Sequence, residues 1–206
     1  MNKVSTVSTM TLDGGAACLD FVNSGYDREK DVIVERLHTF EDLLTLTGRL
    51  QLFSEAALND FKKQASVNEV EARRTLNAAR RARQLLYRLF AGLAQRQPGR
   101  LAKQELAELN RLFARAMQFK IVTVEGNGLQ FSFQPGGAGL MAPVWRLVLS
   151  ARDLLEGGNL QYIRQCQRCA WLFVDKTKNH RKKWCSMESC GNSQKSQRYY
   201  LHKKTP

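Results

Sequence analysis

Residues 166–190 have the sequence CQRCAWLFVDKTKNHRKKWCSMESC, in which four cysteines form two close pairs. Cys166 and Cys169 are separated by two residues, Cys185 and Cys190 by four, and fifteen residues lie between the pairs. Each pair can place two thiolates on one side of a tetrahedral ion while the intervening chain folds back as a hairpin. The spacing therefore predicts a module that is nucleated by one zinc ion, with these four cysteines as its ligands.

Disulfide bonds and ordinary burial are the two alternatives to zinc for these thiols. A reducing cytosol disfavours disulfides, and chance rarely places four of a chain's five cysteines within 25 residues. His180 lies five residues before Cys185 and is a rival ligand, but four thiolates already complete the tetrahedron. Since no coordination position is left for water, we expect a structural ion rather than a catalytic one.

The residues around the ligands predict a small fold that depends on its metal. Residues 171–174 are strand-like, and Trp184 precedes the second pair, so apolar groups can cover the ion from both sides. A segment of about 45 residues buries too little surface to fold alone, whereas a structural zinc ion supplies about 10–16 kcal/mol. A helix is expected over residues 191–203, with Ser189 as its N-cap. This order of elements predicts a treble-clef-like zinc finger with a core separate from that of residues 1–159.

Beyond the cysteines, the module carries a longer pattern of residues, namely Phe173, Asp175, Thr177, Lys178, Asn179, Arg181, Trp184, Ser186, Met187, Gly191, Asn192 and Lys195. With this pattern, residues 160–206 resemble the CGNR zinc-finger family of bacterial transcription regulators. One position departs from the family, because Ser193 stands where the family has the arginine of its name. The departure leaves the metal ligands intact and removes any phosphate or base contact that the arginine would make.

The distribution of charge favours a polyanionic partner. The chain has a formal charge of +13, and residues 160–206 hold 11 Lys or Arg against 2 acidic residues, a net of +9. Residues 1–159 hold the remaining 21 basic and 17 acidic residues, a net of only +4. Such a concentration of positive charge suits nucleic acid. No apolar run is long enough to span a bilayer and residues 1–10 are too polar for a signal peptide, so we expect a soluble, cytoplasmic protein.

Two groups of basic residues are expected to share one surface of the finger. The first lies in the loop before the second cysteine pair and contains Lys176, Lys178, Arg181, Lys182 and Lys183. The second follows a helical spacing and contains Lys195, Arg198 and His202. We expect these cations to contact phosphates, and we expect Asn179 and Asn192 to contact base edges or to fix the loop.

Residues 1–159 are predicted to form a mainly helical domain with one β-hairpin. Helices are expected over residues 16–23, from Thr39 and from Ser54 at capping signals, from Asn68 for the longest, and over residues 101–118 and 141–156. Two strand-like runs, residues 120–125 and 129–134, flank the turn signal at residues 126–128. The fold class is therefore mainly α.

Several polar or reactive residues of this domain have more than one interpretation. Asp20 and Asn23 share one helix face, where they are either solvated or capping groups or the lining of an effector pocket. Cys18 is interpreted as a core residue, since no base or positive partner is evident. Arginines crowd the long helix and form either a solvated face or a nucleic-acid contact, namely Arg73, Arg74, Arg80, Arg81, Arg83 and Arg88.

Residues 19–23, the leucine-rich helix at residues 40–50 and residues 80–94 resemble the ABATE domain that usually precedes CGNR fingers. The resemblance implies a mostly helical sensing or assembly half whose effector is unknown. Such a helix-rich domain is also compatible with a homodimer.

Three functions compete for this chain. The finger could bind DNA as part of a transcription regulator, it could bind RNA, or the helical domain could be an enzyme that uses Cys18 and His38. The enzyme hypothesis is weak because the sequence has no nucleotide loop, hydrolase motif or nucleophile paired with a base. The family resemblance favours DNA over RNA. Exposed aromatic residues that stack on bases would favour RNA, and Tyr199 and Tyr200 are candidates unless they pack against the hairpin.

Overall fold

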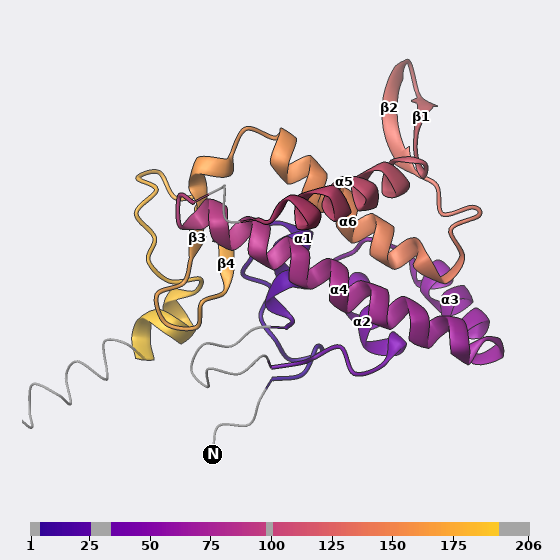
Figure 1. Cartoon of the computed structure of the whole chain (residues 1–206), viewed down its shortest axis with the longest axis horizontal. Helices are drawn as coiled ribbons and strands as arrows, with labels where there is room; N and C mark the ends of the chain where they lie inside the picture. The colour runs from indigo at the N-terminus through magenta and orange to yellow at the C-terminus, as the bar shows by residue number, and fades with distance from the viewer. Residues whose placement is uncertain (1–4, 26–33, 98–100, 194–206) are drawn as a thin grey trace, which may run out of the picture.

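The computed structural model describes residues 5–25, 34–97 and 101–193. Within these residues, α-helices surround one long central helix, a β-hairpin projects from one end, and a small module with two short strands lies at the other (Figure 1). The predicted mainly helical fold with one hairpin and a zinc finger is confirmed. The predicted segment 194–203 of the last helix lies outside the described residues, as do Lys195, Arg198, Tyr199, Tyr200 and His202.

The central helix is α4 (Glu69–Ala94), whose N-cap Asn68 accepts a hydrogen bond from the Glu71 amide at 3.2 Å. Its apolar side places Leu76, Leu86 and Phe90 in the core at helical spacing. The helix contacts every other α-helix of the described chain, namely α1 (Ala17–Asn23), α2 (Phe40–Arg49), α3 (Glu55–Val67), α5 (Lys103–Met117) and α6 (Ala142–Glu156).

Local capping signals set the starts of two of these helices. Thr39 and Asp42 form the predicted capping box of α2, in which each side chain accepts a hydrogen bond from the other residue's backbone N–H. Ser54 caps α3 by accepting from the Ala57 amide at 3.3 Å. Both starts were therefore predictable from short patterns in the sequence.

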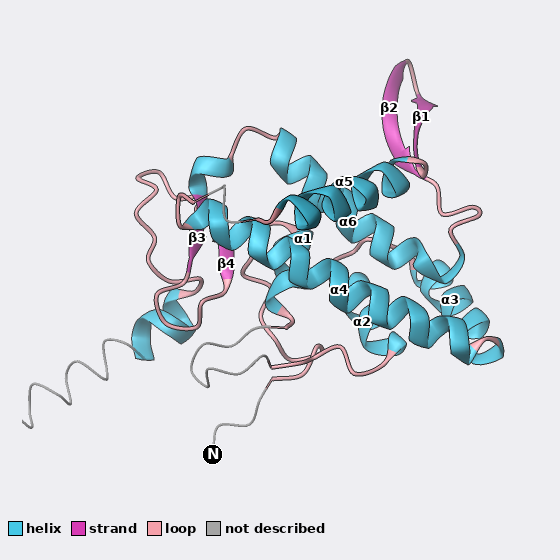
Figure 2. Ribbon diagram, viewed as in Figure 1, coloured by secondary structure: helices cyan, strands magenta, loops and turns pink. Residues whose placement is uncertain are grey.

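The hairpin pairs β1 (Lys120–Glu125) with β2 (Gly128–Phe133) in antiparallel register. Glu125 lies opposite Gly128, so the turn consists of two residues, and β2 begins one residue earlier than predicted. Gly126 has a φ of 58°, as two-residue turns require. The two strands stand clear of the helices (Figure 2).

The C-terminal module follows α6. Its elements are a 3-10 turn (Leu160–Tyr162), β3 (Ile163–Gln165), β4 (Leu172–Val174) and a π-helical turn (Met187–Gly191). The last helix begins at Met187 rather than at residue 191, and its cap is Ser186 rather than Ser189, because the Ser186 hydroxyl accepts from the Ser189 amide at 3.4 Å. The earlier start places the last cysteine inside the first helical turn.

The prediction of separate cores holds only in part, because the module has a small apolar cluster of its own around the cysteines but each half also contributes side chains to the core of the other. Ile163 and Leu172 of the module are buried in the core of the helical domain. In the opposite direction, Met10 from the N-terminal segment is buried beside Trp171 and Phe173 in the core of the module. Apolar side chains thus cross the predicted boundary at residue 159 from both sides.

None of the helices within the described ranges combines the length and the apolar character that a membrane span needs.

Candidate metal centre and the basic loop beside it

The four predicted ligands converge on one point. The sulfur atoms of Cys166, Cys169, Cys185 and Cys190 all lie within 4.8 Å of one another. The Cys169 and Cys185 sulfurs are 3.6 Å apart and those of Cys185 and Cys190 are 3.7 Å apart. A zinc ion at about 2.3 Å from each sulfur requires sulfur atoms about 3.8 Å apart in a tetrahedron. The four cysteines, which are all free thiols, therefore fit one structural zinc ion.

The first pair lies on a tight turn between β3 and β4. The Cys166 amide donates to the Trp171 carbonyl at 2.8 Å, and the Ala170 amide donates to the Cys166 carbonyl at 3.1 Å. Ala170 has a φ of 61°, which lets the chain reverse immediately after Cys169. This turn points both sulfurs to the same side.

The second pair is held by the start of the last helix. The Gly191 amide donates to the Ser186 carbonyl at 3.0 Å, which closes the turn around Cys190. A side chain at Gly191 would put its Cβ 2.9 Å from the Met187 sulfur and would displace that flexible side chain. Helix N–H groups near Cys190 also favour a thiolate.

Without a cation, four thiolates this close together would repel one another, so their ionisation is in conflict. A hydrogen bond with Cys169 lowers the pKa of Cys166, and the same interaction raises the pKa of Cys169. Burial disfavours ionisation of either thiol. A divalent ion removes this conflict because all four groups can then be thiolates.

His180 is engaged elsewhere. Its Nδ1 atom lies 2.8 Å from the Asp175 carbonyl oxygen, and its ring stacks on Tyr162 with the centroids 3.7 Å apart. The described metal-binding cluster contains the four cysteines without it. The rival ligand predicted from the sequence therefore helps to hold the loop instead.

Asp175 organises the loop that carries the predicted cations. Its carboxylate is fully buried and accepts from the Thr177 amide at 3.0 Å, the Thr177 hydroxyl at 2.6 Å and the Lys182 amide at 2.8 Å. Burial alone would raise the pKa of Asp175, but these hydrogen bonds outweigh it and hold the pKa below its usual value. We call this arrangement the Asp175 clamp, because it ties both ends of the loop 176–182 to one side chain.

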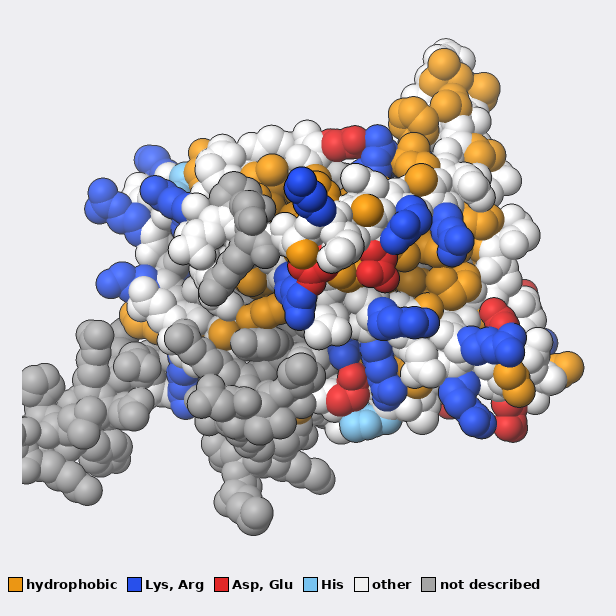
Figure 3. All heavy atoms as spheres, in the orientation of Figure 1, with side chains coloured by type: hydrophobic (Ala, Val, Ile, Leu, Met, Phe, Trp, Pro, Cys, Tyr) orange, Lys and Arg blue, Asp and Glu red, His pale blue; other side chains and the backbone are white. Residues whose placement is uncertain are grey.

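The clamp displays cations on the outside of the loop. Lys176, Lys178, Arg181 and Lys183 are exposed, and in the described part of the chain none of them forms an ion pair. Lys182 differs, since it is half-buried and its ammonium lies 5.2 Å from the centre of the Phe173 ring. The predicted base-contacting residues Asn179 and Asn192 are exposed. Basic side chains gather on this end of the molecule (Figure 3).

Asp20 and Asn23 are buried, so they are not solvated groups. The Asp20 carboxylate accepts from the Gly14 amide at 2.8 Å. Asn23 bonds the backbone of Leu172 in both directions, at 2.8 and 2.9 Å. Asn23 thus joins the helical domain to the module directly, whereas Asp20 holds Gly14, whose carbonyl accepts from the Val174 amide of the module. A role of these two side chains in effector binding stays a prediction.

Two of the arginines of α4, for which a solvated face and a nucleic-acid contact were the alternatives, are structural. Arg83 is 6% exposed and binds both carboxylate oxygens of Glu35, at 2.8 and 2.5 Å. Arg80 donates twice to the Leu37 carbonyl, at 3.0 and 2.7 Å. Neither the solvated interpretation nor the nucleic-acid interpretation fits these two arginines, whereas Arg73, Arg74 and Arg81 are exposed.

Cys18 is a core residue, as predicted. It is fully buried, and burial raises the pKa of its thiol to about 12. A thiol with such a pKa is not a nucleophile at neutral pH.

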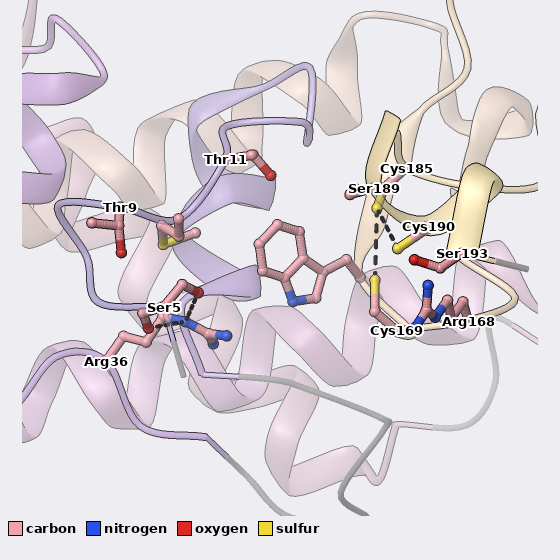
Figure 4. Close-up of a pocket in the computed structure, with 12 residues that line it drawn as sticks. Ser5, Thr9, Thr11, Arg36, Arg168, Cys169, Cys185, Ser189, Cys190 and Ser193 are labelled. Atoms are coloured by element: carbon pink, nitrogen blue, oxygen red, sulfur yellow. Dashed lines mark hydrogen bonds between the residues drawn. The ribbon is translucent and has the colours of Figure 1, made fainter. Parts of the chain in front are cut away.

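Sequence reasoning missed a cavity of about 300 Å³ beside the metal centre (Figure 4). One wall is the N-terminal segment, which contributes Ser5, Thr9 and Thr11, and the other contains Arg168 and Ser193 from the module. The cavity is lined by segments more than 150 positions apart, so no local pattern in the sequence predicts it.

Comparison with known protein families divides the chain in two. Residues 15–158 match the ABATE family, whose description is "Putative stress-induced transcription regulator". Residues 162–203 match the CGNR zinc finger. No curated protein matches the chain.

Proposed function

The chain belongs to the ABATE family, and from this membership we propose that it is a transcription regulator whose zinc finger binds DNA through the basic loop 176–183. The observation that supports this most directly is the Asp175 clamp. It fixes a loop whose exposed cations Lys176, Lys178, Arg181 and Lys183 have no acidic partner among the described residues. A fixed row of cations loses less conformational entropy on binding phosphates than a loose one does.

The described aromatic residues of the finger favour DNA over RNA as the partner. Trp171 and Phe173 are buried, and Tyr162 is stacked on His180. Recognition of single-stranded RNA commonly uses exposed aromatic rings on which bases stack. Among the described residues of the finger the cations have no exposed ring beside them, which suits the phosphate backbone of a duplex.

In this proposal the helical domain controls the finger. The hydrogen bonds between Asn23 and Leu172, together with the buried Met10, connect the two halves. Asp20 and Asn23 would then transmit the state of the helical domain to β4, whether or not they touch an effector. This role goes with the regulatory description of the family.

The test is the salt dependence of binding to a labelled DNA duplex, measured by fluorescence anisotropy on the zinc-loaded full chain. Four phosphate contacts predict a slope of log K against log salt of about −3.6. Each of Lys176→Ala, Lys178→Ala and Lys183→Ala should flatten the slope by about one unit. Lys63→Ala, an exposed lysine of α3, is the matched control and should leave the slope unchanged.

A second arm uses Ser193, which stands in place of the family arginine. Ser193→Arg should tighten binding to DNA by adding a cation beside Arg168. Parallel titrations with duplex and single-stranded RNA of the same sequence decide between the nucleic acids. Binding that ignores both salt and the loop lysines would rule out the proposal, and tighter binding to RNA would reassign the partner.

A further inference from the structure

One face of the β-hairpin is apolar and uncovered. The register places Val122 opposite Phe131 and Val124 opposite Leu129 on the same face of the two strands. Their exposed fractions are 55%, 65%, 75% and 75%. We call these four side chains the hairpin face. In Figure 3 they form part of the hydrophobic surface that covers the projecting hairpin.

The opposite face of the hairpin is mostly polar. Thr123 pairs with Gln130 there, and Gln130 donates a hydrogen bond to the carboxylate of Glu125. Strands that alternate apolar and polar residues normally bury the apolar side. Here the alternation is present, but within the described chain no element covers the apolar side beyond its root.

The root of the hairpin is fixed to the helical core. Phe133 makes edge-to-face contacts with Phe53 and Phe119, with ring centres 6.0 and 6.5 Å apart. The Gln134 amide donates to the Phe119 carbonyl at 2.8 Å, and Lys120 forms an ion pair with Asp153 of α6. The hairpin face is therefore presented from a fixed base.

We propose that the hairpin face packs against the same face of a second copy of this chain, which makes a symmetric dimer. The four side chains are uncharged, and Lys120, which shares their side of the hairpin at its root, is paired with Asp153. The complement of the hairpin face must therefore also be apolar. Of nine large exposed hydrophobic residues in the described chain, five lie on this hairpin. The chain's own hairpin is thus the best match that it offers, and a two-fold axis brings identical patches together.

Two further observations favour a second copy over the chain's own basic end. The described chain ends at residue 193 in the finger, which lies at the opposite end of the molecule from the hairpin (Figure 1). Residues 160–206 carry a net charge of +9, from 11 basic and 2 acidic residues, and an uncharged face offers such a segment no counter-charge. Contact through the hairpins also keeps the two basic modules away from the interface.

The size of the hairpin face predicts a dimer that dissociates on dilution. An isolated two-stranded hairpin is marginally stable in water and gains from an added layer. Exposed apolar patches of a few hundred Å² commonly mark interaction sites. An interface of four side chains from each copy is far smaller than the roughly 20–30 residues per partner of a standard interface, and small interfaces are typical of weak and transient complexes.

The test is sedimentation velocity of the zinc-loaded full chain from about 1 to about 100 μM, a range that resolves micromolar dissociation constants. The wild-type mass should rise from that of the 23.4 kDa monomer toward twice this value. Leu129→Lys and Phe131→Lys should each weaken the dimer by about tenfold or more, because they place like charges opposite each other. Gln130→Lys and Thr123→Lys add the same charge to the opposite face and are the matched controls.

Circular dichroism and zinc content verify that each variant is folded. We expect them to fold, because Leu129 and Phe131 are exposed and contribute little to the core. A wild-type chain that stays monomeric at 100 μM would overturn the proposal. So would a dimer that Leu129→Lys and Gln130→Lys weaken equally, since another surface would then be responsible. The measurement needs no nucleic acid, so its outcome is independent of the proposed function of the finger.

Discussion

The side-chain amide of Asn23 closes a ring of two hydrogen bonds with the backbone of Leu172. Its Nδ2 atom donates to the Leu172 carbonyl at 2.9 Å, and its Oδ1 atom accepts from the Leu172 amide at 2.8 Å. The Val174 amide extends the connection by donating to the Gly14 carbonyl at 2.9 Å. The N-terminal part of the helical domain thus acts as a partner for β4, one of the two strands of the zinc module.

We expect Asn23→Ala to destabilise the whole chain. The substitution leaves the amide and the carbonyl of Leu172 buried without partners, which costs about 2–4 kcal/mol. Urea unfolding of the zinc-loaded protein measures the loss. Asn192→Ala, at an exposed asparagine of the module, is the control and should change stability by less than about 0.5 kcal/mol. Equal stability of the two variants would show that the ring does not support the fold.

The second prediction concerns the metal. Cys185→Ser should release zinc and increase amide hydrogen exchange in the module, including Leu172 and Val174. Because Met10 is buried in the module core, protection of the N-terminal segment should fall too, which would not happen if the module core contained no N-terminal residue. Zinc content and exchange measured by mass spectrometry test both effects. Cys18→Ala, at the cysteine outside the cluster, should keep the ion.

Local sequence signals predicted the parts of this fold that depend on neighbours in the chain. The caps at Thr39 and Ser54, the turn at Gly126 and the cysteine spacing are all set within a few residues. The start of the last helix was missed by several residues, because the cap at Ser186 precedes a stretch without apolar periodicity.

Contacts between distant segments could not be predicted from local patterns. Asn23 and Leu172 are 149 positions apart, and neither residue type identifies its partner. Arg81 and Arg83 lie in the same run of arginines, and nothing in the local sequence distinguishes them. Of these two, Arg83 forms an ion pair with Glu35 and Arg81 is exposed. The Asp175 clamp is an intermediate case, since its partners lie within seven residues but their geometry is not periodic.

The third prediction is a pH effect at Asp20. The pKa of its carboxyl is raised to about 7. Burial is the main cause and the charge of Asp13 adds to it, while a hydrogen bond from the Gly14 amide acts in the opposite direction. A carboxyl whose pKa is higher in the folded state than in the unfolded state binds more protons when folded. Stability should therefore decrease as pH rises from about 4 to about 7. Asp20→Asn removes this ionisation, so urea unfolding should show a gain over wild type at pH 8 that shrinks at pH 5.

A contrary result would be a parallel pH dependence in the two proteins. Such a result would mean that ionisation of Asp20 does not destabilise the folded chain. The charge of Arg49, which lowers the pKa of Asp20, would then offset the effect of burial.

The fourth prediction separates the arginines of α4. Arg83→Ala removes the closer of the two arginines that pair with Glu35 and leaves this partly buried carboxylate with Arg80 at 3.5 Å, which should cost about 2–4 kcal/mol. Arg81→Ala, at an exposed arginine two residues earlier, should cost less than about 0.5 kcal/mol. Thermal and urea unfolding of both variants test whether the ion pair is structural. Similar losses for the two substitutions would contradict that assignment.

The last prediction asks whether the shape of the basic loop matters beyond its charge. In Asp175→Asn the side chain keeps one accepting oxygen instead of two, so it can hold either Thr177 or the Lys182 amide but not both, and one end of the loop is released. The substitution also removes a negative charge, and charge alone would tighten binding to DNA. We expect binding to weaken instead, by about threefold to tenfold, because the cations are no longer held in one arrangement.

Glu188→Gln is the matched control, since it removes the same charge from an exposed residue of the module and leaves the clamp intact. Anisotropy titrations at one salt concentration, with zinc content verified, should therefore show weaker DNA binding for Asp175→Asn and tighter DNA binding for Glu188→Gln. If Asp175→Asn binds DNA as tightly as Glu188→Gln does, the clamp has no part in binding and the loop acts only through its net charge.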